Sequence, residues 1–320
     1  MTPRLRTAAA AALALVLSAS LAACGSDSSQ SGPQSQGSSQ SASSPSAPEV
    51  DRSGKANFPK VVGDFGEDPE ISAGSGDAPD RVSVKTLHEG SGATLTTKDT
   101  VLVNYELALW DGTKVESSFE TKQPIAFSLG QVIPGWTYGL QGQKVGDRLE
   151  LVVPAKWGYG DKATGSIPAG STLVFVVDVL DSTSNVKIDE DALKQGAPTG
   201  AEAPAGVEVS SEPGAEPTLS FAEGAAAPTE NSHTTIVKGT GAAIEEDDYV
   251  LYRGVGAPFG AASTSSWSAE PLAAKAATLG IAGETVGSRI VFVVGAGPGA
   301  QSGSTPTVIV MDVVGVMKTK

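Results

Sequence analysis

Residues 131–140 read Gln-Val-Ile-Pro-Gly-Trp-Thr-Tyr-Gly-Leu, and this stretch decides the predicted fold. Pro134 has a φ angle already suited to the first turn of a helix, where its missing N–H loses no hydrogen bond. Trp136 and Leu140 are four residues apart and therefore share one face of that helix. The β-branched pair before the proline is predicted to end an extended run. Strand patterns on both sides predict a curved sheet wrapped around one short helix, with Trp136 on its buried face.

Three further stretches fit the same sheet. In residues 101–107 apolar side chains alternate with polar or small ones, which places Tyr105 on the core side of a strand. Residues 157–160 form a glycine-spaced aromatic loop, Trp-Gly-Tyr-Gly. Residues 171–180 have the character of a strand that carries Phe175. The sequence therefore predicts a small domain with an aromatic interior.

The order and spacing of these pieces resemble the FKBP-type peptidyl-prolyl cis/trans isomerases. The family pattern is a strand with a tyrosine, then D-G-x-x-x-x-S-S, V-I-x-G-W, V-G-x-R, a Y-G loop, I-P and T-L-V-F-x-V. The matching parts of this chain are Tyr105, residues 111–118, residues 132–136, residues 145–148, Tyr159 with Gly160, Ile167 with Pro168, and residues 172–177. No single piece is specific, but the ordered set spans about 100 residues, a normal domain size. The resemblance implies an α+β fold in which a curved antiparallel β-sheet wraps around one short helix.

The resemblance also implies an activity, the cis/trans isomerisation of X–Pro bonds, and gives roles to the residues of a proline pocket. Trp136 forms the floor beneath the proline ring. The residues implied to bind substrate are Val115, Phe127, Val132, Trp136, Ile167 and Phe175. Those implied to act in catalysis are Tyr105, Glu116, Ile133 through its backbone N–H, and Tyr159 through its hydroxyl.

The implied reaction requires no covalent step. The X–Pro amide is planar because of resonance, which gives a rotation barrier of about 18–20 kcal/mol. Twisting the bond lowers its charge separation, so a dry aromatic pocket favours the twisted state over the planar one. We therefore expect no cofactor. We also expect no metal, because the two histidines, His88 and His233, have no Cys, Asp or Glu at ligand spacing.

The pocket residues depart from the family pattern in ways that bear on activity. Val115 stands where the family commonly has phenylalanine. Glu116 replaces a usual aspartate, and Thr121 replaces an arginine that often pairs with it. These differences imply slow turnover and weak binding of macrolide inhibitors. They keep open a non-catalytic proline-binding chaperone or interaction lipoprotein, which captures proline-containing segments without accelerating them, and a purely structural lipoprotein.

The N-terminus predicts the compartment. Arg4 and Arg6 precede an apolar run, residues 8–17, which is too short for a stable spanning helix. Residues 21–24, Leu-Ala-Ala-Cys, resemble a bacterial lipobox, with cleavage before Cys24 and a diacylglycerol on its sulfur. The alternative is an ordinary secretory signal in which Cys24 is incidental. We expect an extracytoplasmic protein, lipid-anchored to the cell membrane through Cys24, whose partners are proline-containing segments of exported or cell-envelope proteins.

The net charge bears on which partners the protein can bind, and the cysteine content bears on whether it can form a disulfide. The formal net charge is −14, which argues against nucleic acid as a partner because its phosphates require clustered Lys and Arg. The chain has one cysteine, so an intrachain disulfide is excluded.

The second half of the chain repeats the first in order. Residues 145–153 match residues 286–294, and a leader at residues 62–71 matches residues 210–219. The predicted parts are a signal peptide (1–23), a lipid-anchored flexible tether rich in Ser, Gln and Pro (24–57), an FKBP-like isomerase domain with a leader strand (58–182), a linker (183–206) and a degenerate FKBP-like domain (207–320).

The second copy is predicted to be degenerate because the pocket aromatics are missing from it. Gly254 stands in place of Tyr105, and residues 272–281 replace the Trp136 helix. The core pattern persists while the pocket is lost. We therefore expect the second copy to be a structural or partner-binding domain without isomerase activity.

Overall fold

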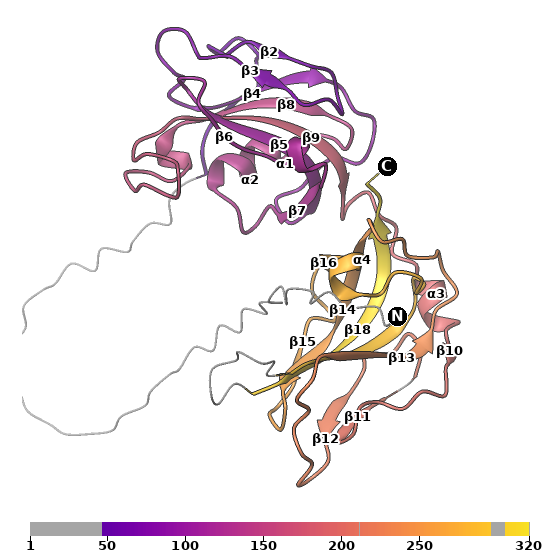
Figure 1. The fold of residues 1–320 in the computed structure, drawn as a ribbon. Coiled ribbons are helices and arrows are strands. Elements are labelled where there is room, and N and C mark those ends of the chain that lie inside the picture. Colours follow the sequence, from indigo (N-terminus) through magenta and orange to yellow (C-terminus); the bar gives the residue numbers. More distant parts are fainter. Residues whose placement is uncertain (1–46, 211, 296–304, 320) are drawn as a thin grey trace, which may run out of the picture. The chain divides into compact units, whose positions relative to one another are not determined.

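The computed structural model describes residues 47–210, 212–295 and 305–319 (Figure 1). The predicted signal peptide, Cys24 and residues 25–46 of the predicted tether lie outside the described residues. Within the described ranges the chain forms mainly antiparallel sheets with few, short helices, as the sequence predicts. No helix in these ranges has the length and apolar character needed to cross a bilayer.

The first sheet has seven strands in the order β1-β4-β8-β9-β5-β6, with β7 also paired to β5 (Figure 1). The strands are β1 (Val50–Asp51), β4 (Val82–His88), β5 (Thr100–Leu109), β6 (Lys114–Ser117), β7 (Ile125–Ser128), β8 (Arg148–Val153) and β9 (Leu173–Ser182). The pairs are antiparallel except for β1, which runs parallel to β4.

The core of this sheet lies on the face that packs against helix α2 (Pro134–Leu140). Strands β8 and β9 are rich in Leu and Val, and successive side chains point to opposite faces. Leu149 and Leu151 of β8 are fully buried and belong to one cluster with Trp136 and Leu140 of α2. The predicted helix with its buried tryptophan is thus confirmed by the structure.

Two short helical turns accompany α2 that the sequence did not predict. They are α1 (Ser118–Thr121), after β6, and the 3-10 turn η1 (Ala155–Trp157), after β8. The expected extended run before Pro134 is also wrong: β7 ends at Ser128, and a bend of irregular residues leads into α2. This bend lets the chain turn from the sheet edge into the helix.

The leader contains β1, an edge strand of the sheet, and a hairpin formed by β2 (Val61–Val62) and β3 (Glu70–Ile71). The hairpin lies against the outer face of the sheet, opposite α2. The Lys85 amine lies 5.7 Å from the centre of the Phe58 ring, and the Trp110 indole donates to Gly76 O. The predicted tether therefore ends earlier than residue 57, because β1 is already a strand of the sheet.

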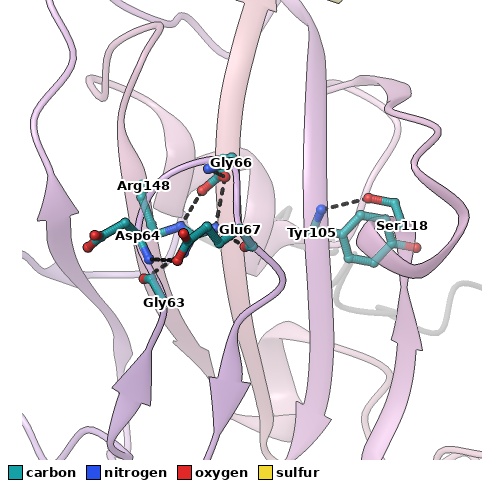
Figure 2. Close-up of polar contacts among 8 residues, drawn as sticks. Gly63, Asp64, Gly66, Glu67, Tyr105, Ser118 and Arg148 are labelled. Carbon is teal, nitrogen blue, oxygen red and sulfur yellow. Dashed lines mark hydrogen bonds and ion pairs between the residues drawn. The ribbon is translucent and has the colours of Figure 1, made fainter.

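A buried ion pair fixes the leader hairpin to the sheet. Arg148 and Asp178 are opposite each other on β8 and β9, and both side chains are almost fully buried. Arg148 also donates to Gly63 O at 2.7 Å and to Glu67 O at 2.6 Å (Figure 2). The Gly66 N–H donates to Asp178 at 2.7 Å. Charge and hydrogen bonding thus satisfy this buried pair and order the loop between β2 and β3.

A second buried carboxylate on the outer face lacks hydrogen bonds of this kind. Glu150 of β8 is fully buried, and neither of its oxygens accepts a hydrogen bond from the described residues. Lys85, opposite it on β4, approaches to 3.7 Å. Burial raises the pKa of Glu150 to about 7, although Lys85 acts in the opposite direction. The carboxyl is therefore protonated in mildly acidic solution and becomes a buried charge as the pH rises.

Stability should depend on this group between pH 4.5 and 7. The folded-state pKa of about 7 exceeds the ordinary value of 4.5, so the native state keeps a proton that the unfolded chain releases. The contribution of the protonated Glu150 to the free energy of unfolding is therefore lost as pH rises through this window, and the loss is about 3 kcal/mol. We expect Glu150→Gln to gain stability over the parent by this amount between pH 5 and pH 8, measured by urea unfolding. Glu89→Gln, an exposed change, is the control; an equal difference at both pH values would contradict the prediction.

The second sheet repeats the strand order of the first, β10-β13-β17-β18-β14-β15 with β16 also paired to β14 (Figure 1). Its strands are β10 (Ala197–Pro198), β13 (Ser232–Lys238), β14 (Tyr249–Pro258), β15 (Thr264–Ser265), β16 (Leu272–Lys275), β17 (Arg289–Val294) and β18 (Thr307–Met317). A leader hairpin, β11 (Val207–Val209) with β12 (Leu219–Phe221), lies between β10 and β13 in the sequence.

The ion pair is repeated in the second sheet. Arg289 of β17 and Asp312 of β18 are opposite each other and buried. Arg289 also donates to Ser210 O and Ala215 O of the second leader. The predicted match between the two leaders therefore has a physical basis, since each supplies two carbonyls to a buried arginine.

One expectation for the second half, an unstructured linker at residues 183–206, is wrong in detail. The predicted linker contains a helix, α3 (Glu190–Lys194), and strand β10, which pairs with β13. The Asp189 side chain accepts from Ala192 N and so caps α3. Residues 272–275 form strand β16 rather than helix, and only α4 (Ala276–Leu279) follows it. The segment that would form a helix like α2 is therefore reduced to a single turn.

Candidate active site

A cavity of about 110 Å³ opens between α2 and the first sheet. Its walls come from β5, β6, β7, β9, the start of α2 and the loop after η1. The lining residues are Tyr105, Leu107, Glu116, Phe127, Val132, Ile133, Trp136, Tyr159 and Phe175. Residues that are distant in the sequence therefore meet around one opening, as the sequence predicted.

Trp136 is the centre of an aromatic cluster. The centre of its ring lies 5.6 Å from Tyr105, 5.3 Å from Phe127 and 5.3 Å from Phe175. The interplanar angles of 89°, 75° and 79° are edge-to-face arrangements, which aromatic quadrupoles favour. Only 4% of Trp136 is exposed. The arrangement gives the cavity a rigid, apolar interior.

Small residues let α2 approach the sheet closely enough to close the cavity. A Cβ atom at Gly135 would collide with Val153, and one at Gly139 would collide with Leu151. The Thr137 hydroxyl donates to Leu129 O at 2.6 Å, which ties the helix to the end of β7. These contacts fix the height of Trp136 above the sheet.

The turn α1 helps to hold Tyr105 in place. The Tyr105 N–H donates to the Ser118 hydroxyl at 2.9 Å (Figure 2). That hydroxyl donates to the Asn104 side chain at 3.3 Å. β7 pairs with β5 up to Val103, and β6 pairs with β5 from Glu106 onward. The Ser118 hydroxyl therefore takes the place of a strand partner for the Tyr105 N–H. Tyr105 therefore keeps a fixed direction into the cavity.

Tyr105, Glu116 and Tyr159 form the polar edge of the cavity. Burial raises the pKa of the Tyr105 hydroxyl, and a hydrogen bond with Glu116 and the charge of Glu116 raise it further. Tyr105 is thus a neutral phenol beside the carboxylate of Glu116. Tyr159 is 39% exposed, in a loop held by the hydrogen bond from Gly160 N to Ala155 O. Its hydroxyl can therefore reach a bound chain.

Ile133 offers a backbone donor at the start of α2. It is the N-cap residue, with φ −58° and ψ 144°, and its carbonyl accepts from Trp136 N and Thr137 N. Among the described residues no acceptor pairs with the Ile133 N–H. The first N–H groups of a helix lack internal partners, so this donor is available to a carbonyl of a bound peptide.

Eight of the ten predicted pocket residues line the cavity. The other two, Val115 and Ile167, pack against the core cluster and are absent from the lining. Leu107 lines the cavity although the sequence did not identify it as a site residue. The signal was present, because Leu107 follows Tyr105 by two positions on β5 and so points to the same face.

No group of three or more His, Cys, Asp or Glu residues with metal-binding geometry occurs in residues 47–210, 212–295 and 305–319. The polar groups around the cavity are a carboxylate, two phenols and a backbone N–H. This set can orient an uncharged peptide segment, and an apolar interior can hold its side chain. The site is therefore suited to holding a segment of a peptide chain.

Comparison with known proteins gives one family for this region. The family model for FKBP-type peptidyl-prolyl cis-trans isomerase matches residues 92–180. The FK506-binding protein of Streptomyces anulatus is 40% identical over 119 residues, which are 36% of this chain and 96% of that protein. The FKBP-type peptidyl-prolyl cis-trans isomerase FkpA of Aeromonas hydrophila is 46% identical over 91 residues, 28% of this chain and 34% of that protein.

One solved structure also has a segment similar to part of this chain. The crystal structure of FkpA from Escherichia coli matches 31% of this chain and 46% of its own, with 40% identity and a TM-score of 0.30. The chain thus spans about a third of the length of the Aeromonas FkpA and under half of the solved FkpA chain.

Proposed function

The chain belongs to the family of FKBP-type peptidyl-prolyl cis-trans isomerases, and from this premise we propose that it accelerates the isomerisation of X–Pro bonds in exported proteins. The observation that carries the proposal is the cavity around Trp136, with its aromatic walls and its free Ile133 N–H. The proline-containing segment of an exported or cell-envelope protein is the substrate.

In the proposed mechanism the proline ring rests on Trp136 between Phe127 and Phe175. The Ile133 N–H and the Tyr159 hydroxyl hold carbonyls of the flanking backbone. The apolar interior excludes water, and the twisted amide is less charge-separated than the planar one. The site therefore stabilises the transition state more than the ground state, which is the requirement for catalysis.

The Tyr159 hydroxyl should contribute to turnover and little to stability. Tyr159→Phe removes one hydrogen bond to the substrate, worth about 0.5–1.5 kcal/mol, so we expect kcat/KM to fall about 2- to 13-fold. Tyr138→Phe is the matched control, because Tyr138 lies on α2 but does not line the cavity. The measurement is catalysed isomerisation of a proline peptide. Equal activity of the Tyr159 variant and the parent would remove this residue from the mechanism.

We propose that the activity is exerted outside the cytoplasm at the membrane surface. The support is the sequence pattern before Cys24, which resembles a lipobox. Mass spectrometry of the protein from its native membrane tests this. A diacylglycerol adduct on Cys24 is the expected result, and a free thiol in a shorter or uncleaved chain contradicts it.

We also propose that the second sheet is a degenerate copy of the first, without isomerase activity. The shared strand order and the repeated arginine–aspartate pair support this. At the position of Tyr105 in β5, β14 has Gly254, and α4 is a single turn. Aromatic pocket residues are therefore missing from the repeated framework.

The alternative is a binding module that captures proline segments without accelerating them. The half-buried Val115 favours it, because this valine does not reach the cavity at a position where the family resemblance implies a larger side chain in the wall. An isomerisation assay combined with a titration of the same proline peptide separates the two. Acceleration supports the isomerase; saturable binding that Trp136→Phe weakens, without acceleration across several residues before proline, supports the binding module.

A further inference from the structure

Arg52 connects the leader to the far end of the active-site helix. It directly follows β1, which aligns Val50 with Val82 and Asp51 with Ser83 of β4. Its guanidinium donates to Tyr138 O and to Gln141 O, each at 2.7 Å, and to Gly139 O at 3.5 Å. A residue outside the family-matched region, 92–180, is thus bound to α2.

The last carbonyls of a helix have no partners within it and carry partial negative charge. Helix α2 has no basic residue in its last turn, and the left-handed Gly142 that follows Gln141 donates its N–H to Leu95 O rather than to a carbonyl of the helix. Arg52 supplies a positive charge beside the negative end of the helix. It also supplies hydrogen-bond donors for the unpaired carbonyls, because one guanidinium can donate to several acceptors. Burial lowers its pKa, as expected for a cation held against protein.

External ties matter for α2 because it is short. It has seven residues and no side-chain cap at its N-terminus, and helices of this length are not stable alone. Its N-terminal end carries the Ile133 N–H, and its buried face carries Trp136. A tilt of α2 at its C-terminal end would therefore move both groups that meet the proline segment.

We propose that Arg52 is a positioning residue, which fixes the Ile133 N–H and Trp136 by binding the carbonyl end of α2. The inference rests on the proposed isomerase function for its kinetic consequence. On this proposal, the segment around β1 that leads into the first sheet helps to support the pocket. Asp51 strengthens this link, because it accepts from Ser53 N at 2.8 Å and shapes the turn around Arg52.

The test uses the full mature chain with Arg52→Ala, Arg52→Lys and the control Arg81→Ala. Arg81 is also close to β1 and, like Arg52, is exposed, but its guanidinium pairs with Glu49 at 2.8 Å rather than with α2. We expect Arg52→Ala to lower kcat about tenfold with KM changed less than about twofold, since a small misplacement of binding groups weakens the transition state most. Arg52→Lys should recover part of the loss, and Arg81→Ala should match the parent.

A second readout separates this inference from the proposed function. In NMR spectra, the Ile133 amide and Trp136 indole signals should shift in Arg52→Ala and remain in place in Arg81→Ala. If the parent shows no isomerase activity, the proposed function fails, and the NMR shifts alone decide the role of Arg52. If the parent is active and Arg52→Ala has the same kinetics, the proposal is overturned. Unchanged Ile133 and Trp136 signals in Arg52→Ala would also overturn it, whether or not the parent is active. Equal losses of kcat in Arg52→Ala and Arg81→Ala would overturn it as well.

Discussion

Replacing Arg148 with alanine is expected to lower the free energy of unfolding by about 3–5 kcal/mol, because the change leaves a buried charge without its partner. Asp178 is fully buried, and its Oδ2 atom lies 2.9 Å from the Arg148 guanidinium. The same change removes the donors to Gly63 O and Glu67 O (Figure 2). The leader hairpin would then lose its main polar link to the sheet.

The repeated pair in the second sheet provides a matched comparison. Arg289→Ala should have a similar cost, because Arg289 is equally buried and binds Asp312 and two leader carbonyls. Arg81→Ala, an exposed change, should cost less than about 1 kcal/mol. Urea unfolding followed by circular dichroism measures all three. A cost below about 1 kcal/mol for Arg148→Ala would show that water or rearrangement compensates the buried aspartate.

A double variant separates charge from packing. When Arg148→Met is combined with Asp178→Leu, both charges are absent and no ion is buried alone. Such replacements of buried pairs are often neutral or stabilising, so the double variant should recover most of the lost stability. The carbonyls of the leader would remain without a donor, and protease cleavage between β2 and β3 should therefore still be faster than in the parent.

The pocket could be predicted from the sequence because its parts have local patterns. Alternation along β5 gives the direction of Tyr105, and the spacing from Pro134 gives the face of Trp136. Phe175 lies within a continuous apolar strand. Each of these inferences depends on residues within a few positions of one another. The structure places all three in contact around one cavity.

The support of the pocket could not be predicted in the same way, because it depends on contacts between distant segments. Arg148 was visible within V-G-x-R, but its pairing with Asp178 follows from the register of β8 with β9. Arg52 lies 86 positions before the first carbonyl that it binds. Val115 and Ile167 are half-buried or buried beside the cavity, and only the packing decides that they do not line it.

Segments assigned from composition were the least well predicted. Residues 50 and 51 form strand β1, although the sequence predicted a flexible tether over residues 24–57. In the linker, Asp189 before an acidic first turn, with Lys194 in the last turn, is a helix signal. Residues 272–281 stand in place of the Trp136 helix in the sequence, but the first four of them pair with β14 as a strand.

The largest effect on activity is expected from Trp136→Ala. The change removes the floor of the cavity and the ring that Tyr105, Phe127 and Phe175 contact edge-on. The loss of apolar contact with the proline ring is worth about 1.5–3 kcal/mol, so kcat/KM should fall about 10- to 150-fold. Catalysed isomerisation of a proline peptide measures the effect, and a folded variant with parental activity would exclude Trp136 from the site.

The same change should also lower stability, by about 3–5 kcal/mol, because it leaves a void in the core. Activity must therefore be compared at a temperature where circular dichroism shows both proteins folded. Trp136→Phe fills part of the void and keeps an apolar floor, so it should lose less stability and less activity. Trp267→Ala is the control, because Trp267 stacks on Arg253 at 4.4 Å in the second sheet and does not line the cavity. A graded loss from Phe to Ala at position 136, with none at position 267, would assign the effect to the floor of the pocket and not to the number of tryptophans.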